Sequence, residues 1–165
     1  MLVGVVLTAR LGFWQLSRAA EKEQRHAAIM AQMAEPVLDT AAVLGQPSYF
    51  KSLHQRVVLQ GEWLPEHTLY LDNRAMNGRA GFWVLTPLQL DASTRVLVQR
   101  GWVPRHQLDR TLLPAIQTPG GWVQVNGRIA PPPSRLMALS QEPQATSTAS
   151  GVSKIRQNLD LDTYA

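Results

Sequence analysis

Short stretches of alternating apolar and polar residues, separated by turn residues, recur along the chain from residue 56 onward. Such alternation is typical of β-strands with one face in a core. The short link Pro65-Glu66 predicts a hairpin-like return, and Asn77-Gly78 is a turn dipeptide. Because few helical patterns intervene, we expect a mainly β (α+β) fold, built as an antiparallel sheet or a small β-barrel. Strands are predicted at residues 56–63, 67–74, 81–90, 96–104, 121–129 and, at the end, within 152–159.

The strand predicted at residues 96–104 has the strongest signal, because it is rich in β-branched residues and closes with a proline. Alternation places Val96, Val98, Arg100 and Trp102 on one face and Leu97, Gln99, Gly101 and Val103 on the other. An inward-facing arginine needs an anionic or hydrogen-bonding partner, and Asp72 offers a carboxylate. Alternatively, Gly101 marks a bulge that turns Arg100 outward.

These strands carry a set of polar and aromatic residues that we regard as candidate structural or partner contacts. The set consists of Asp72, Arg74, Arg79, Arg100 and Trp102.

The first 35 residues predict one helix, which we interpret as the end of a membrane anchor and its juxtamembrane extension. The apolar run has a charge, Arg10, inside it and is shorter than the roughly 20 residues that span a bilayer, so the helix is expected to be partly transmembrane. Trp14 is placed at interface depth, and Arg18, Lys22 and Arg25 share a face that can meet lipid phosphates. Glu21 and Arg25 form a favourable i, i+4 pair. The alternative is a solvated amphipathic helix packed on the rest of the chain.

Residues 36–165 are expected to form one soluble β-rich domain. A helical turn is predicted at Asp39 to Leu44, and Pro36 ends the preceding helix. A stretch rich in Pro, Ser, Thr, Gln and Ala predicts a flexible loop near 131–151.

Composition adds two constraints to this pattern. The net charge of the 165 residues is only +4, and arginine far outnumbers lysine, which occurs only at Lys22, Lys51 and Lys154. The chain has no cysteine, which excludes disulfides, zinc-thiolate sites and thiol chemistry.

No motif of an enzyme active site occurs in the sequence. The histidines His26, His54, His67 and His106 are scattered, and there is no G-x-S-x-G, phosphate-binding loop or nucleotide fingerprint. Glu62, Glu66 and His67 are close in sequence but are interpreted as a solvated cluster rather than a metal site. We therefore expect a protein without catalytic, cofactor-binding or metal-binding residues of its own.

Tryptophan falls once in each of four predicted strands, and arginines accompany it. An oligonucleotide-binding barrel interleaves arginine and aromatic residues in this way to stack bases. Core packing or a protein interface explains the same pattern, and the modest net charge favours those interpretations over nucleic-acid binding. The tryptophans are Trp63, Trp83, Trp102 and Trp122, and the arginines are Arg56, Arg79, Arg100 and Arg128.

Several motifs, in order along the chain, resemble those of the Surfeit-locus family of cytochrome oxidase assembly proteins. Leu11 to Arg18 followed by Glu21-Lys22 is similar to the family signature L-G-x-W-Q-L-x-R-x-x-E-K. The further matches are residues 61–65 (GEWLP), 71–74 (LDNR), 78–82 (GRAGF), 86–88 (TPL), 98–104 (VQRGWVP) and 157–160 (QNLD).

The resemblance implies a membrane-anchored assembly factor for haem–copper cytochrome oxidase that assists haem a delivery to the large catalytic subunit. It implies oxidase subunit I, other assembly factors and membrane lipid as partners, and no nucleic acid. It also implies two transmembrane helices that bracket a soluble domain, on the periplasmic side of the bacterial inner membrane or in the mitochondrial intermembrane space.

The sequence departs from the family pattern at both ends. The first anchor lacks its beginning, and the second helix is missing together with the family's H-x-x-Y-x-x-x-W haem motif. We therefore expect no specific, stoichiometric haem a site within this chain. A periplasmic interaction domain without a haem role is the remaining alternative.

Overall fold

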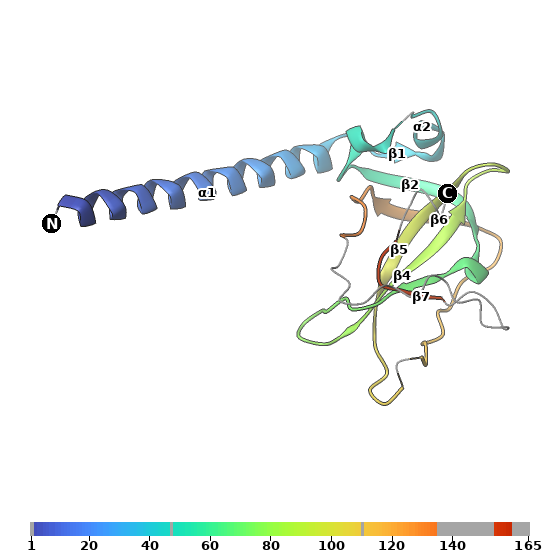
Figure 1. The fold of residues 1–165 in the computed structure, drawn as a ribbon. Coiled ribbons are helices and arrows are strands. Elements are labelled where there is room, and N and C mark those ends of the chain that lie inside the picture. Colours follow the sequence, from blue (N-terminus) through green and yellow to red (C-terminus); the bar gives the residue numbers. More distant parts are fainter. Residues whose placement is uncertain (1, 47, 110, 135–153, 160–165) are drawn as a thin grey trace. The chain divides into compact units, whose positions relative to one another are not determined.

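The computed structural model describes residues 2–46, 48–109, 111–134 and 154–159, and for residues 2–7 and 49 it describes the backbone only. It is a mixed α+β structure, as the pattern predicts, with a long N-terminal helix and a multi-strand sheet (Figure 1). The chain divides into two compact units. Unit 1 comprises Met1–Val57 and Gly127–Pro131, and unit 2 comprises Val58–Asn126 and Pro132–Ala165.

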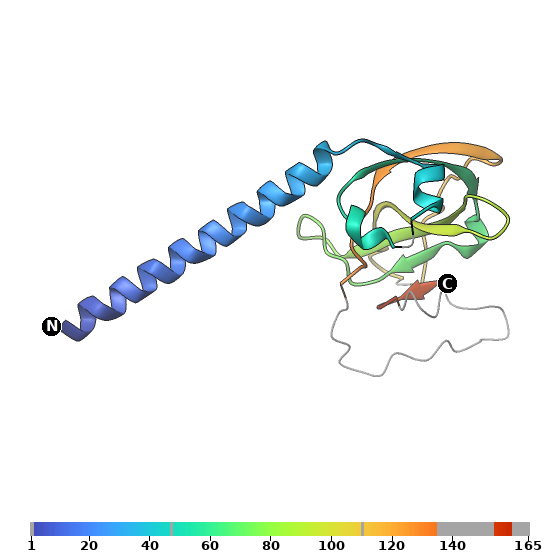
Figure 2. The same cartoon turned by 90° about the horizontal axis from the view of Figure 1, so that it is seen from above.

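Helix α1 (Leu2–Ala34) is unbroken along its whole length, which confirms the prediction of one continuous N-terminal helix (Figures 1 and 2). It ends just before Glu35-Pro36, because a residue that precedes proline is disfavoured in the helical conformation. The predicted i, i+4 pair is present, with Arg25 Nη2 2.9 Å from Glu21 Oε1. No helix among the described residues is long and apolar enough to cross a membrane.

The rest of unit 1 consists of short elements after α1. Strand β1 (Leu38–Asp39) leads into α2 (Thr40–Leu44), which occupies the predicted helical turn. Asp39 is its N-cap, since the Asp39 carboxylate accepts from Ala42 N at 2.7 Å. A 3-10 helix, η1 (Tyr49–Ser52), follows and precedes β2 (Arg56–Trp63).

The predicted hairpin between residues 56–63 and 67–74 is wrong. Strand β2 and strand β3 (Leu69–Leu71) do not return on each other, because both pair antiparallel with β4 (Gly81–Gln89). The registers Trp63↔Leu88 and Leu71↔Trp83 show that they follow one another along β4. The Pro65–His67 segment is a 3-10 helix, η2, inserted into a single extended path rather than a hairpin turn.

This interruption lies where β4 contains Pro87. Proline has no N–H to donate to a neighbouring strand, so a continuous ladder is not available there. The Pro87 carbonyl still accepts from Leu64 N at 3.0 Å. Beyond η2, the hydroxyls of Thr68 and Thr86 lie 3.0 Å apart in a buried hydrogen bond, and β3 then continues the pairing.

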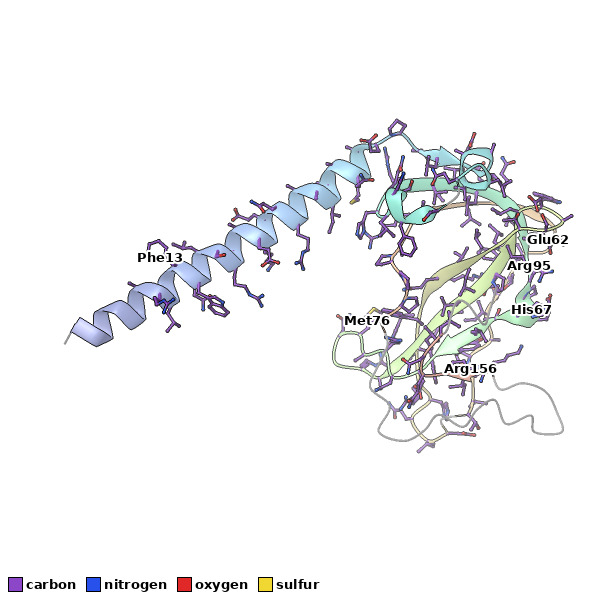
Figure 3. All side chains as sticks on the ribbon, turned by 45° about the horizontal axis from the view of Figure 1, so that its top comes forward. Phe13, Glu62, His67, Met76, Arg95 and Arg156 are labelled. Atoms are coloured by element: carbon purple, nitrogen blue, oxygen red, sulfur yellow. The ribbon has the colours of Figure 1, made fainter. Side chains whose placement is uncertain are left out.

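A tight turn joins β3 to β4 at the predicted Asn77-Gly78 dipeptide. Both residues have positive φ, 50° and 74°, as a type I′ turn requires, and glycine adopts that conformation without steric cost. Met76 and Arg79 exchange backbone hydrogen bonds of 2.9 and 3.0 Å across it. Met76 is labelled at this turn in Figure 3.

Strand β5 (Arg95–Pro104) pairs with β4 through a bulge. Val84 is opposite Gly101 whereas Leu85 is opposite Gln99, so Arg100 is the extra residue. The bulge breaks the predicted alternation, and Arg100 and Trp102 therefore do not continue one regular face. Gly101, with φ of 152°, provides a backbone conformation that other residues rarely adopt.

Six buried residues of β3 and β4 form two clusters, one on each face of these strands. Leu69, Leu71 and Leu85 form one cluster, with Leu97 against it. Tyr70, Phe82 and Val84 form the other, with Val103 against it. Leu97 and Val103, predicted to share a face, thus pack in different clusters because the bulge lies between them.

The last strands complete the sheet. Strand β6 (Trp122–Arg128) pairs with β2 and matches the predicted strand at 121–129. Strand β7 (Ile155–Arg156) pairs with β3 in parallel, so the sheet is not purely antiparallel. The predicted flexible loop near 131–151 falls mostly outside the described residues.

Candidate partner-binding surface

Asp72 follows β3 and is almost fully buried, with 7% of its surface exposed. Its carboxylate pairs with the guanidinium of Arg105, the first residue after β5, and accepts from Asn73 N at 2.6 Å. The predicted pairing of Asp72 with Arg100 is therefore wrong. The pairing of β4 and β5 continues one residue past Pro104, since Arg105 N donates to Ala80 O at 3.1 Å, and this brings Arg105 to Asp72.

Arg74 is also buried, and it has no carboxylate partner among the described residues. Its guanidinium donates to the backbone carbonyls of Ser134 (3.0 Å) and Gln157 (3.4 Å) and lies 4.8 Å from the centre of the Trp83 ring. Burial lowers the pKa of Arg74, but an arginine stays charged in a protein. Arg74 thus fastens two segments that are far apart in the sequence to β4.

The backbone at Asn73 sets this orientation. The amides of Tyr70 and Asp72 both donate toward β7, to Lys154 O and Arg156 O. Asn73 has a φ of 58°, and the next amide, that of Arg74, donates instead to Gly81 O, at the start of β4. The Arg74 carbonyl in turn accepts from Trp102 Nε1 at 2.6 Å, which joins two of the predicted contact residues.

Arg100 lies apart from this group. Its guanidinium donates to the Gln117 carbonyl at 2.8 Å and to the Thr118 hydroxyl, and it lies 4.8 Å from the centre of the Trp63 ring. The alternative prediction of a bulge at Gly101 is confirmed. The bulge does not leave Arg100 without a partner, since Arg100 holds the segment that follows β5 instead of pairing with an acid.

A pocket of about 600 Å³ opens beside the turn and the end of β5. Arg79, of the predicted set, reaches it together with Arg105. Leu108 is 94% exposed and Leu112 is 54% exposed, although both are leucines. The remaining lining residues are Pro104, His106, Gln107, Leu113 and Pro114.

Sequence reasoning missed Arg105, Leu108 and Leu112. Arg105 lies just beyond Pro104, where the predicted strand closes. Leu108 and Leu112 lie in a stretch without strand or helix periodicity, and no pattern distinguishes an exposed leucine from a buried one there. The available signal was the mixture of Arg, His and Leu directly after the strongest strand.

The tryptophans of the sheet are mostly engaged within the protein. Trp63 and Trp83 each lie against an arginine, and Trp102 donates to a carbonyl. These contacts agree with the interpretation of the three tryptophans as packing residues rather than as platforms for stacked bases. Trp122 differs, since 68% of its surface is exposed.

The four histidines lie on separate parts of the chain: on α1, before β2, in η2 and after β5. His106 Nδ1 accepts from Asp109 N at 3.0 Å, and His67 lies 3.6 Å from Glu66. The described residues contain no group of three His, Cys, Asp or Glu side chains that could hold a metal ion.

On the described residues, the chain is an α+β protein whose arginines brace a sheet beside an open, partly apolar pocket. The sequence profile of the SURF1 family matches residues 2–165, and the chain therefore belongs to the SURF1 family. This confirms the resemblance drawn from the motifs.

Individual relatives are similar to about three-fifths of the chain. A SURF1-like protein of Rickettsia bellii is 32% identical over 104 residues, which cover 62% of this chain and 41% of the relative. A SURF1-like protein of Rickettsia felis is also 32% identical, over 62% of this chain and 44% of the relative. The cytochrome oxidase assembly protein SHY1 of Saccharomyces cerevisiae is 23% identical over 62% of this chain and 27% of its own length. These alignments span less than half of the relatives' length.

Proposed function

We propose that this protein is an assembly factor for cytochrome c oxidase that works at the membrane surface and assists haem a delivery to the large catalytic subunit. The observation that carries the proposal is membership of the SURF1 family over residues 2–165. The similarity to the yeast protein named as a cytochrome oxidase assembly protein supports the choice of enzyme. The partners are oxidase subunit I and other assembly factors, and the location is the periplasmic side of the bacterial inner membrane.

Helix α1 supplies the membrane contact in this proposal. At about 100° per residue, Trp14, Arg18, Lys22 and Arg25 fall within a sector of about 80° on an unbroken helix. All four are exposed, and Arg18 lies 5.7 Å from the centre of the Trp14 ring. An indole at interface depth with cations beside it matches the polar boundary of a bilayer that carries anionic lipids.

Haem a is treated as cargo in this proposal. The chain is proposed to assist delivery without an iron ligand of its own, because none of its four histidines lies in an apolar run of the sequence. Titration of haem a into the purified protein, followed by absorbance, is expected to show no sharp one-to-one endpoint. An endpoint that disappears when one of His26, His54, His67 or His106 is replaced would move the haem site into this chain.

Deletion of the coding gene tests the assembly role. Deletion is expected to reduce cytochrome oxidase activity and the haem a absorbance of membranes, while the other respiratory complexes keep their activity. Normal oxidase activity in the deletion strain would contradict the assembly role. For the anchor, the natural protein is expected to resist alkaline extraction from membranes, and its release into the supernatant would contradict that part.

A further inference from the structure

The pocket beside the turn combines cationic and apolar groups that no contact within the described residues explains. Arg79 is exposed, and its side chain makes no hydrogen bond or ion pair with the described residues. Arg105 uses Nη2 to bind Asp72, while its Nε is buried without a partner. Among the described residues, Arg79 is therefore the arginine of this pocket whose guanidinium is free to receive an anion, with the paired Arg105 beside it.

His106 adds a further donor at the pocket. Because its Nδ1 accepts from Asp109 N, the neutral ring carries its proton on Nε2. The nearest carboxylate on the same segment, that of Asp109, accepts from the amide and the hydroxyl of Thr111 at 2.8 and 2.7 Å. These hydrogen bonds lower the pKa of Asp109, and its carboxylate is engaged with its own turn rather than with the pocket arginines. The positive groups of the pocket outnumber the negative ones.

The apolar side chains of the pocket include two leucines that are exposed to solvent. Leu108 is the most exposed of the large apolar residues described, and Leu112 lies in the same wall. Among the described residues of unit 2, only Met76 and Trp122 are comparable, so half of the exposed large apolar residues described there gather at this pocket. Burial of such leucines on binding is the main driving force of association.

We propose that this pocket binds a segment of a partner polypeptide that carries a carboxylate next to large apolar side chains. The carboxylate is received by Arg79, with Arg105 and His106 as further donors, because guanidinium groups match carboxylates in a bidentate manner. The apolar side chains cover Leu108 and Leu112. The inference rests on the proposed function in one respect, since an assembly factor acts on other polypeptides.

Size and charge favour a peptide over a bilayer surface. A volume of about 600 Å³ lies within the range of about 300–1,000 Å³ of pockets that enclose a compact ligand, so it suits a few side chains. Segments that bind anionic lipid surfaces usually gather about four to eight lysines and arginines. The pocket has two arginines and is lined by apolar residues.

The test uses the full chain and a fluorescent ten-residue peptide in which aspartate alternates with leucine, titrated by anisotropy. Binding is expected to weaken at least tenfold in Arg79→Ala and in Leu108→Ala. Arg128→Ala and Phe50→Ala are matched controls, because both side chains are exposed and neither lines the pocket. The controls are expected to bind as the wild type does, and a peptide with asparagine in place of aspartate is expected not to bind.

Three outcomes would overturn the inference: no binding of the acidic peptide, equal binding of the asparagine peptide, or equal weakening in the controls. A fourth is that Arg79→Ala and Leu108→Ala abolish binding to vesicles of phosphatidylglycerol but leave peptide binding unchanged, which would assign the pocket to lipid. The gene-deletion experiment separates this inference from the proposed function. Normal oxidase activity after deletion would refute the assembly role without changing peptide binding to the purified protein.

Discussion

Arginine lies over an aromatic ring both on α1 and in the sheet, but the two environments differ. On α1, Arg18 reaches Trp14 one turn away and both side chains are exposed. At the sheet, Arg74 reaches Trp83 of β4 from the connection that follows β3, is buried, and also donates to two carbonyls. Such contacts contribute about 0.5–1 kcal/mol when exposed and about 2 kcal/mol or more when desolvated. The same pair of residue types is therefore a minor surface contact in one region and a structural connection in the other.

The ion pairs give the largest test of this contrast. Asp72→Ala is expected to destabilise the protein by about 3–5 kcal/mol, because it leaves the charge of Arg105 without its partner in a nearly buried site. Glu21→Ala is the matched change on α1, where the pair with Arg25 is exposed, and it is expected to cost only about 0.3–0.5 kcal/mol. Urea unfolding of both variants measures the two values. Equal costs would show that the sheet pair is not desolvated.

Loss of the buried arginine is the next largest effect. Arg74→Ala is expected to destabilise by about 1.5–3 kcal/mol, the usual contribution of hydrogen bonds to a charged group. Arg18→Ala on α1 is expected to change stability by less than about 0.5 kcal/mol, as surface substitutions usually do. Arg74→Lys separates charge from geometry, since an ammonium lacks the planar guanidinium that donates to Ser134 and Gln157. A stability for Arg74→Lys equal to that of the wild type would contradict the role of the guanidinium geometry.

Two glycines sharpen the comparison further. A Cβ on Gly81 would collide with the Trp102 ring and the Val103 carbonyl, so Gly81→Ala is expected to destabilise by about 1–3 kcal/mol. A Cβ on Gly12 of α1 would contact nothing, and Gly12→Ala is expected to favour the helix by about 0.8–1 kcal/mol. Urea unfolding reports the first variant and the far-ultraviolet circular dichroism of the helix reports the second. A stabilising Gly81→Ala would show that β4 and β5 separate easily there.

The smallest expected effect is a pH dependence in the sheet. Tyr70 donates to Pro114 O at 2.9 Å, and burial raises the pKa of its phenol although the charge of Arg100 opposes this. The folded state therefore keeps the proton to higher pH than the unfolded state does. The resulting stability is fully present below the ordinary tyrosine pKa of about 10 and is lost as pH rises through the folded value. Unfolding as a function of pH should show this slope in the wild type and not in Tyr70→Phe, and a slope unchanged in that variant would assign it to another group.

The parts of the fold that sequence patterns predicted are local. The continuous helix α1, the Glu21–Arg25 pair and the Asn77-Gly78 turn each depend on residues within a few positions of one another. Wrong or missed features depend on register between distant strands. One extra residue in β5 moved Arg100 away from Asp72, and one further backbone bond beyond Pro104 brought Arg105 there instead.

The same reasoning explains the outcome for the candidate site. Motif similarity identified the family, because short motifs in the correct order need no knowledge of register. Of the predicted contact residues, Asp72, Arg74 and Trp102 each have a partner within the structure, and Asp72 pairs with Arg105 rather than with Arg100 as expected. The exposed Leu108 has no sequence signature, since exposure is decided by how the segment after β5 lies on the rest of unit 2.

The two hydrogen bonds that Arg74 donates, to the Ser134 and Gln157 carbonyls, also bear on how the chain tolerates a change in length. Ser134 and Gln157 both accept from the same guanidinium, so the interval of sequence between them has its two ends held close together. The entropy cost of bringing the ends of a chain segment together grows only with the logarithm of its length, by about 0.6 kcal/mol for each doubling of the number of residues. A change in length between residue 134 and β7 is therefore expected to cost little free energy, and that interval is a suitable place for an engineered tag or reporter domain.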